Sequence, residues 1–218
     1  MRDFYLLGYC WILLLFTTSC SKSTVESFPS VSMELGIASF DSEGRVDSLF
    51  LDRGDLLSVI KKEMGKVPVF PALSYARVLT YLETKTEGEA ILYDMVQIPI
   101  IEPNSSELHP TDLRKDPISL VRIWLGGGFL NMEYGVKAVD LSLHDFLFTE
   151  NIVEVGDNAM EAHLVMYHNR GGDIEGSTKK HIVSFSLERY KNELETPFVL
   201  RVFIPTYSGQ KEYNFTID

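Results

Sequence analysis

The sequence has no apolar run long enough to cross a membrane. Its longest run, residues 4–16, has thirteen residues and is interrupted by Gly8, whereas a membrane-spanning helix needs about 20. A run of this length is typical of a secretory signal, and signal peptidases accept small residues before the cleavage point. Small polar residues fill positions 17–19, directly before Cys20. The sequence therefore predicts a signal peptide over residues 1–19 that is cleaved before Cys20.

A serine directly before a cysteine at this distance from the start resembles a bacterial lipobox, in which the cysteine thiol is diacylated and the chain is cut in front of it. Thr17 departs from the leucine that is more common at its position. Each buried methylene contributes about 0.8 kcal/mol and stable anchoring takes two acyl chains, so lipid on Cys20 would anchor the protein to a membrane. An ordinary secretory signal with a chance cysteine and an uncleaved anchor helix remain alternatives.

Cysteine is almost absent, since the chain contains only Cys10 and Cys20. Cleavage removes the first and lipid occupies the second. The mature chain is therefore expected to have no intramolecular disulfide, no cysteine nucleophile and no thiolate metal site. Because small exported domains often rely on disulfides, this one must be stabilised by burial of its cores.

The segment after the cleavage site, residues 20–30, is polar and has no periodicity, as expected of a tether. Fully extended, its ten residues 21–30 reach at most about 35 Å. Many surface-exposed lipoproteins of Bacteroidota carry an acidic run here, whereas this chain has Glu26 alone. We therefore expect a protein of the cell envelope, attached to the outer membrane through Cys20 and facing the periplasm rather than the cell surface.

Positive charge is scarce. The chain has 20 basic and 31 acidic residues and a net charge of −11. The excess is spread evenly, with a net charge of −5 over residues 31–102 and −6 over residues 116–218. Binding to a nucleic-acid backbone depends on clustered Lys and Arg, and neither half has such a cluster. Nucleic acid is therefore excluded as an expected partner.

The dominant positive signal is a series of short segments rich in β-branched, aromatic and aliphatic residues, separated by turn residues. This pattern predicts an all-β protein. In residues 31–102 the predicted strands are 31–40, 46–52, 76–84 and 89–101, and the segment 56–64 fits either a strand or a helix. Five strands in about 70 residues indicate a small, OB-like barrel.

Residues 103–117 are polar and proline-rich, which predicts a linker between two domains. The segment 118–218 follows, and seven regularly spaced strands in about 100 residues are typical of a β-sandwich. The predicted strands are 118–126, 129–136, 138–146, 159–169, 181–190, 198–207 and 211–218. In the last of them, strict alternation directs Tyr213, Phe215 and Ile217 toward the core.

The second half carries the segments ISLVRIWLGGGFLNMEYG, HLVMYHNRGGDIEG, VSFSLERY and VLRVFIPTYSGQKEYNFTI in that order. With these segments the chain resembles the NigD-like lipoproteins of Bacteroidota. The first half resembles the family less closely, through LFLDRGDLL and VLTYLET. The resemblance implies an OB-type domain and a β-sandwich behind a lipoprotein signal. It also implies a role in bacteriocin immunity or production, and it supplies no catalytic residues.

Histidine and carboxylate side chains are the candidates for metal or acid-base chemistry. The histidines are His109, His144, His163, His168 and His181. His163 and His168 are five residues apart, which places them on opposite faces of one strand, so neither metal ligation nor any other cofactor is expected from them. Asp173 and Glu175 share a loop, and their carboxylates are candidate ligands for calcium, which prefers several oxygen ligands. The simpler interpretation is that both carboxylates are solvated.

Familiar catalytic motifs are missing: the sequence has no GxSxG, HExxH or Walker loop. Four aromatic residues near the glycine turn and in the strands are candidates for an exposed interaction surface: Trp124, Phe129, Tyr134 and Tyr167. Such a surface would suit protein or sugar contacts, while packing into the core is the alternative.

Taken together, these features predict a non-enzymatic, membrane-anchored binding protein whose partner is a protein or peptide, with bacteriocin immunity as the specific version. The first alternative is a lipoprotein that binds a glycan or another solute through exposed aromatic residues. The second is a hydrolase whose site is assembled from distant loops. The pattern leaves the oligomeric state open.

Overall fold

The structure of the protein is a computed structural model. It describes residues 29–62, 70–85, 88–105, 113–155, 159–195 and 197–218. The expected signal peptide, the lipidation site Cys20, most of the tether and His109 lie outside these residues. Residues 31–218 form one compact unit. Within the described part of the chain, no helix is long and apolar enough to cross a membrane.

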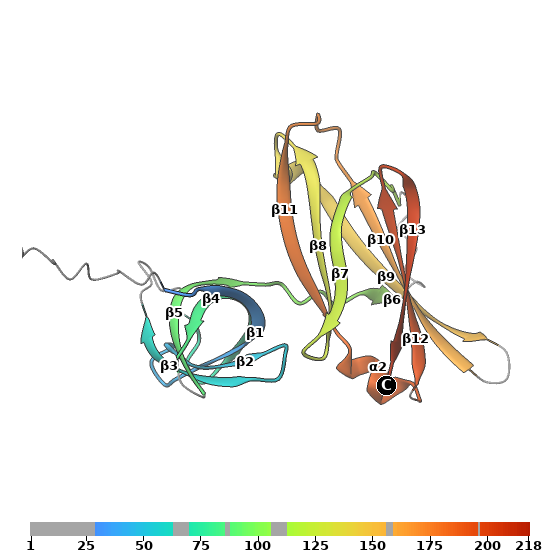
Figure 1. Ribbon diagram of the computed structural model, residues 1–218. Coiled ribbons are helices and arrows are strands. Elements are labelled where there is room, and N and C mark those ends of the chain that lie inside the picture. Colours follow the sequence, from blue (N-terminus) through green and yellow to red (C-terminus); the bar gives the residue numbers. More distant parts are fainter. Residues whose placement is uncertain (1–28, 63–69, 86–87, 106–112, 156–158, 196) are drawn as a thin grey trace, which may run out of the picture. The chain divides into compact units, whose positions relative to one another are not determined.

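The first domain is a closed five-stranded barrel (Figure 1). Its strands are β1 (Ser32–Phe40), β2 (Val46–Leu51), β3 (Leu56–Lys62), β4 (Tyr75–Thr84) and β5 (Glu89–Gln97). They follow one another around the ring in the order β1-β2-β3-β5-β4, and β4 pairs with β1 to close it. This agrees with the predicted OB-like barrel. Because the ring is closed, the barrel offers no free strand edge.

The sequence left open whether residues 56–64 form a strand or a helix. In the structure Leu56–Lys62 is strand β3. Leu57 and Val59 belong to the barrel core, while Leu56 is 65% exposed. Pairing with β2 on one side and with β5 on the other satisfies the backbone groups of this short segment. An isolated helix of the same length would be marginal.

The barrel closes tightly at Gly36 in β1, which pairs with Leu51 of β2. A Cβ atom placed at Gly36 would lie 2.6 Å from the backbone oxygen of Phe50 and 3.2 Å from the Cα atom of Leu51. Both neighbours are backbone atoms and cannot rotate away. Glycine is therefore required here for space.

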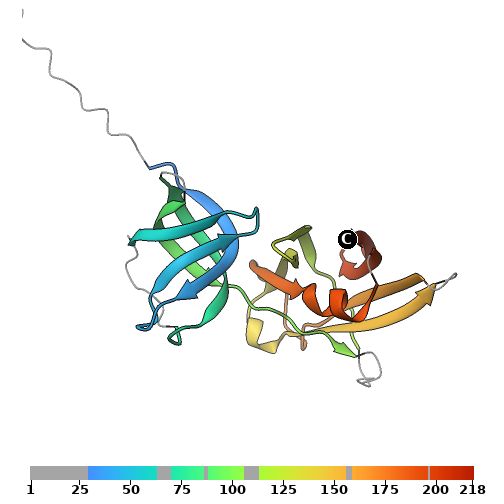
Figure 2. The same ribbon diagram turned by 90° about the horizontal axis from the view of Figure 1, so that it is seen from below.

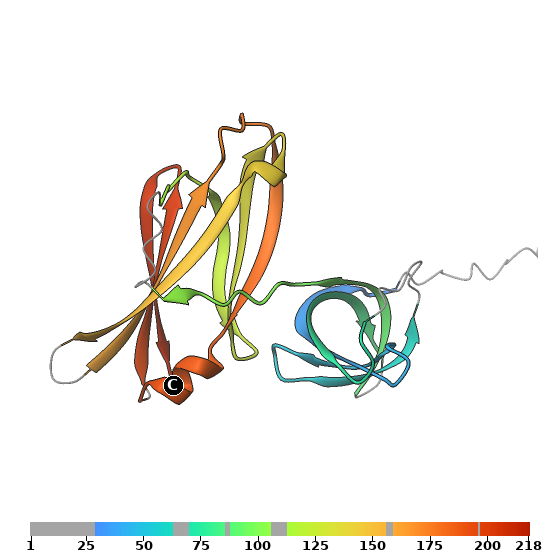
Figure 3. The ribbon, with the colours of Figure 1, turned by 180° about the vertical axis from the view of Figure 1, so that it is seen from behind.

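The second domain is a β-sandwich with two sheets (Figure 3). The larger sheet has the order β13-β12-β10-β9-β6 and the smaller one β11-β8-β7. Their strands are β6 (Asn104–Ser105), β7 (Ser119–Gly126), β8 (Phe129–Ala138), β9 (Asp145–Val155), β10 (Ala159–Asn169), β11 (Ser177–Ser186), β12 (Phe198–Thr206) and β13 (Gly209–Ile217). The all-β fold predicted from the sequence is therefore confirmed.

The strand predicted at 138–146 is wrong. A short 3-10 helix, η1 (Leu141–Leu143), interrupts the segment, and β9 begins only at its end. The side chain of Asp140 accepts a hydrogen bond from the backbone N–H of Ser142 at 3.0 Å and so caps η1. Capping by Asp competes with strand pairing, and this outweighed the apolar alternation. Most of β9 was consequently missing from the predicted strands.

The strand predicted at 181–190 is also wrong in its second half. Strand β11 ends at Ser186, and a six-residue helix, α2 (Glu188–Glu193), follows it (Figure 2). Tyr190 on this helix is buried, and its hydroxyl donates to Glu150 Oε2 on β9 at 2.6 Å. Six residues are too few for a helical period to stand out in a sequence.

The two sheets enclose the larger of the two main hydrophobic cores. Ile217 is buried in it, and Tyr213 and Phe215 pack against it. The inward direction predicted for these three side chains is thus confirmed. The segment after β5 covers one side of the sandwich, because it pairs with β11 at Ser184 and then with β9 through β6 (Figure 3). Strand β6 lies within the expected linker 103–117.

A polar network joins barrel and sandwich around Arg77, whose side chain is fully buried. Its guanidinium forms a bidentate ion pair with Asp52 of the barrel, which includes an Nη2–Oδ2 contact of 2.6 Å. It also donates to Asn131 Oδ1 at 2.9 Å and to Ser184 Oγ at 3.2 Å, both on the sandwich. The ring of Phe129 lies 4.4 Å from the guanidinium carbon. These contacts satisfy a charge that would otherwise be costly to bury.

Candidate functional site

The sandwich has a groove on the side that the segment after β5 does not cover. Its volume is about 420 Å³, and it lies between the start of β7 and the β12–β13 hairpin. It is lined by Ile118, Ser119, Leu120, Thr206, Tyr207, Ser208, Lys211 and Tyr213. The lining thus combines aliphatic and aromatic side chains with four polar residues, and apolar walls with a few placed polar groups are the usual form of a binding site.

The local pairing of the chain places these residues together. Residues 114–118 run between the ends of β10 and β12, where Ile118 donates its backbone N–H to Pro205 at 2.9 Å. This contact fixes the point at which β7 begins. Strand β12 then turns at Gly209, which has a φ of 98°, a value that favours glycine. The hairpin thereby brings Tyr207 and Tyr213 to the same groove.

The two strands that flank the groove are both at the edge of a sheet, but their edges differ. Strand β13 pairs with β12 in an unbroken register from Gly209 to Ile217. Strand β7 has a register shift between Leu120 and Arg122, which leaves Val121 as the bulged residue. A bulge bends an edge and hinders further pairing. The regular edge of the groove is therefore that of β13.

Charge in the groove is opposite in sign to that of the whole chain. Lys211 is the one charged side chain in its lining, and among the described residues no carboxylate pairs with it. Its neighbour Glu212 forms an ion pair with Arg201 at 3.0 Å and does not line the groove. The protein has a net charge of −11, but Lys211 gives the groove a local positive charge beside apolar side chains.

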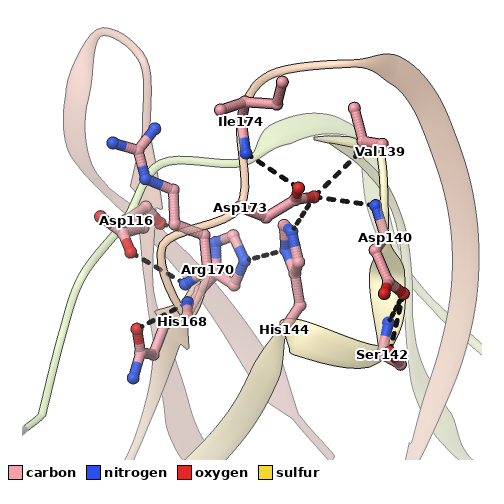
Figure 4. Close-up of polar contacts among 11 residues, drawn as sticks. Asp116, Val139, Asp140, Ser142, His144, His168, Arg170, Asp173 and Ile174 are labelled. Atoms are coloured by element: carbon pink, nitrogen blue, oxygen red, sulfur yellow. Dashed lines mark hydrogen bonds and ion pairs between the residues drawn. The ribbon is translucent and has the colours of Figure 1, made fainter.

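Next to the groove, beyond Tyr207, a chain of hydrogen bonds links two buried histidines (Figure 4). His168 Nδ1 lies 3.1 Å from the backbone oxygen of Asp116, and His168 Nε2 lies 2.9 Å from His144 Nδ1. His144 Nε2 lies 3.2 Å from Asp173 Oδ2. The same oxygen accepts the backbone N–H groups of Val139 and Asp140.

This series of hydrogen bonds has an acceptor at each end: the backbone carbonyl of Asp116 and the carboxylate of Asp173. Three hydrogen bonds between them need three protons on the two imidazole rings, because a neutral ring carries only one N–H. The cluster thus holds the turn before β9 against the loop after β10.

The titration of the cluster follows from its surroundings. Burial lowers the pKa of His168, and the hydrogen bond to Asp116 only partly opposes this. Burial acts to raise the pKa of Asp173, but hydrogen bonds from Asp140, His144, Val139 and Ile174 outweigh it and hold that pKa below its usual value. The lowered pKa of Asp173 favours the carboxylate that accepts these hydrogen bonds, and the lowered pKa of His168 favours a neutral ring at that position.

The four aromatic residues proposed as an interaction surface do not lie together. Tyr134 is only 3% exposed, and burial raises its pKa to about 12. Phe129 packs on Arg77 in the junction, and Trp124 packs against the apolar cluster there. Tyr167 lies on β10, beneath the ammonium group of Lys115. None of the four lines the groove.

The other predicted candidates are engaged in structural contacts. His163 Nε2 lies 3.0 Å from Glu161 Oε2 on the same strand, whereas the buried His168 contacts His144. Glu175 pairs with Lys137 at 2.9 Å instead of converging on the carboxylate of Asp173. In the described residues no group of three His, Cys, Asp or Glu side chains could hold a metal ion.

Sequence reasoning missed the groove, because its walls come from parts of the chain that are far apart in sequence. Tyr213 was correctly directed inward, but alternation alone cannot show that one edge of its strand is uncovered. The link between His144 and His168 was also missed, since no motif has their spacing. One sequence signal could have pointed to the groove: along β13 the residues change from charged to apolar, and Lys211 and Tyr213 are two residues apart.

Comparison with known families gives one match. Residues 100–217 match the NigD-like C-terminal beta sandwich domain, which is more than half of the chain. The chain belongs to the NigD-like family. The NigD-like family is not a known enzyme family, and the match spans the whole groove and the histidine cluster. No curated protein matches this NigD-like chain.

Solved structures show the same fold. A NigD-like immunity protein from Bacteroides caccae aligns with a TM-score of 0.70 and 23% identity, and the alignment covers 88% of this chain and 100% of that protein. A protein of unknown function from Bacteroides vulgatus aligns with a TM-score of 0.61 and 19% identity, covering 86% and 92%. At these identities the likeness extends to the fold, so the NigD-like architecture includes both the barrel and the sandwich.

Proposed function

We propose that this NigD-like protein is a lipid-anchored protein of the cell envelope that binds a protein or peptide partner without catalysis. The observation that carries the proposal is the groove of the sandwich, which is lined by both apolar and polar side chains and is flanked by two strand edges. Exposed strand edges and apolar grooves are the common means by which proteins hold extended polypeptides.

The partner of the proposed function is a toxin or a component of its export. The support is the name of a relative with the same fold, an immunity protein of Bacteroides caccae. Anchoring through Cys20 would concentrate the protein at the membrane, where a bacteriocin acts. The outer membrane, with the sandwich facing the periplasm, is the proposed location, supported by the lipobox-like sequence and the missing acidic run after it.

The anchor is tested by Cys20→Ala in the bacterium that makes the protein. Loss of two acyl chains removes most of the membrane affinity, so the variant should move from the membrane fraction to the soluble fraction. A variant that stays in the membrane fraction contradicts lipidation at this residue.

Binding is tested by placing a photoreactive amino acid at Ser208, which lines the groove, in the full anchored protein. The matched control carries it at Ser58, an exposed position on the barrel. The proposal expects one polypeptide to be cross-linked from Ser208 and not from Ser58. Identical products from both positions, or none from either, overturn it.

Immunity is tested by deleting the gene and measuring sensitivity to bacteriocins made by the same or related strains. The expected result is greater sensitivity, which the wild-type protein restores and Cys20→Ala does not. Unchanged sensitivity removes immunity but leaves the binding experiment at Ser208 to decide the more general proposal.

A further inference from the structure

Strand β13 has a long, regular outer edge, and no strand in the described part of the chain pairs with it. Its nine residues all pair with β12 on one side, and it ends the order of its sheet on the other. An unpaired edge displays a row of backbone N–H and C=O groups that can pair with another strand. Strand β13 contains no proline and no register shift that would prevent such pairing.

The other edges of the described sheets are modified in ways that hinder pairing. The bulge at Val121 interrupts β7. Residues 99–101 cover β11 at Ser184, and its remaining half carries Lys179 and Lys180, which are exposed. Lysines on an edge are a common protection against added strands. The edge of β13 has no bulge, no segment among the residues that the structure describes covers it, and it faces a groove.

The side chains of β13 define what a new strand would meet. Lys211 and Tyr213 are two residues apart, so they point to the same face, and both line the groove. Leu120 lies on the opposite wall, across from them. Alternate side chains of an added strand would enter the groove, while the others would face solvent.

We propose that β13 accepts an extended segment of the partner polypeptide as an added antiparallel strand. The segment places an apolar side chain beside Tyr213 and Leu120, and an acidic side chain beside Lys211. Because the added strand runs opposite to β13, the apolar residue comes first and the acidic one follows two positions later. This inference rests on the proposed function, since it names the mode of binding and the chemistry of the bound segment.

Charge complementarity favours this occupant over the alternatives. Lys211 has no carboxylate partner among the described residues, although the chain has 31 acidic residues. Placing Lys or Arg beside it would bring like charges together, whereas opposite charges on adjacent strands attract each other. An acidic residue in the bound segment would neutralise the charge of Lys211.

The experiment uses the mature protein with Cys20→Ala and three synthetic octapeptides of alternating valine and threonine. In the first, one inward valine is glutamate, in the second it is lysine, and the third is the first with alternate backbone nitrogens methylated. Fluorescence anisotropy should show the glutamate peptide binding at least threefold tighter than the lysine peptide. Methylation should abolish binding, because it removes the donors that pair with β13.

Two charge-reversal variants locate the contact. Lys211→Glu should reverse the preference between the glutamate and lysine peptides, whereas Lys180→Glu on β11 should leave it unchanged. Both side chains are exposed, so neither substitution should unfold the protein. Equal affinity for the two peptides, unaltered binding after methylation, or a reversal caused by Lys180→Glu overturns the proposal.

Two other occupants of the edge are outcomes of the same work. Concentration-dependent dimers that Lys211→Glu dissolves would show that a second copy of the chain pairs there. Peptide binding that appears only after residues 20–28 are removed would show that the tether occupies the edge. Either result overturns the proposed partner segment. If the peptides fail but cross-linking from Ser208 succeeds, strand addition is wrong and the proposed function stands.

Discussion

The barrel and the sandwich are built from the same kinds of residues but differ in closure. The barrel is a complete ring with no free edge, and it contains no histidine between residues 31 and 102. The sandwich leaves strand edges uncovered, has a groove along one side and encloses a pair of hydrogen-bonded histidines. The open sheets of the sandwich therefore offer strand edges and a groove for binding, which a closed barrel lacks. This difference locates the candidate site in the sandwich and gives the barrel a supporting position.

The largest expected effect comes from removing the polar interactions of Arg77 that join the barrel to the sandwich. Arg77→Met should destabilise the protein by about 3–5 kcal/mol, because it leaves the carboxylate of Asp52 largely buried without its counter-charge. Urea unfolding measures the free energy, and separate probes in each domain should then show two transitions. The control is Arg45→Met, which removes an exposed ion pair with Asp41 and should leave the unfolding midpoint almost unchanged. Equal effects would contradict a structural role for Arg77.

Closure of the barrel is tested at Gly36. Gly36→Ala should cost about 1–3 kcal/mol, since a methyl group there would press on the backbone of β2. Thermal unfolding followed by circular dichroism measures this loss. Asp47→Ala, at an exposed position on β2, serves as the control and should change stability by less than about 0.5 kcal/mol. A fully stable Gly36→Ala variant would show that β1 and β2 can move apart.

The smallest expected effect is a difference in acid sensitivity. The pKa of His168 is lowered in the folded protein, so its contribution to stability is present above about pH 6.5 and is lost as the pH falls. The lowered pKa of Asp173 acts in the same direction below its ordinary value of 3.8. Amide hydrogen exchange should therefore rise first in the turn before β9 and the loop after β10, while the barrel stays protected. His168→Gln should weaken the dependence near pH 6.

The sequence predicted the fold where local alternation and core packing agree. The segments 46–52 and 159–169 are examples, and each became a strand close to its expected bounds. Prediction failed where a local interaction opposed the pattern, as Asp140 did by capping η1. The junction at Arg77 could not be foreseen, because an arginine between apolar neighbours gives no sign of the partners that neutralise it.

The candidate site was predicted least well, for a related reason. Alternation shows which face of a strand is buried, but it does not show which edge stays uncovered. Lys211 and Tyr213 became informative only once β7 and the β12–β13 hairpin were known to flank them. The aromatic residues first considered were chosen by size and position near a turn, and size also suits a core or a junction.

The insertion of residues 114–118 between β10 and β12 has a consequence for the speed of folding. Asp116 must find His168, 52 residues away, and Ile118 must find Pro205 before the start of β7 is fixed. Such distant pairings slow folding, typically to milliseconds or seconds, whereas the β1–β2 hairpin of the barrel joins residues close in sequence. Local hairpins such as β1–β2 in the barrel and β12–β13 in the sandwich should therefore form first, and the groove, which needs the distant contact between Ile118 and Pro205, should be completed late.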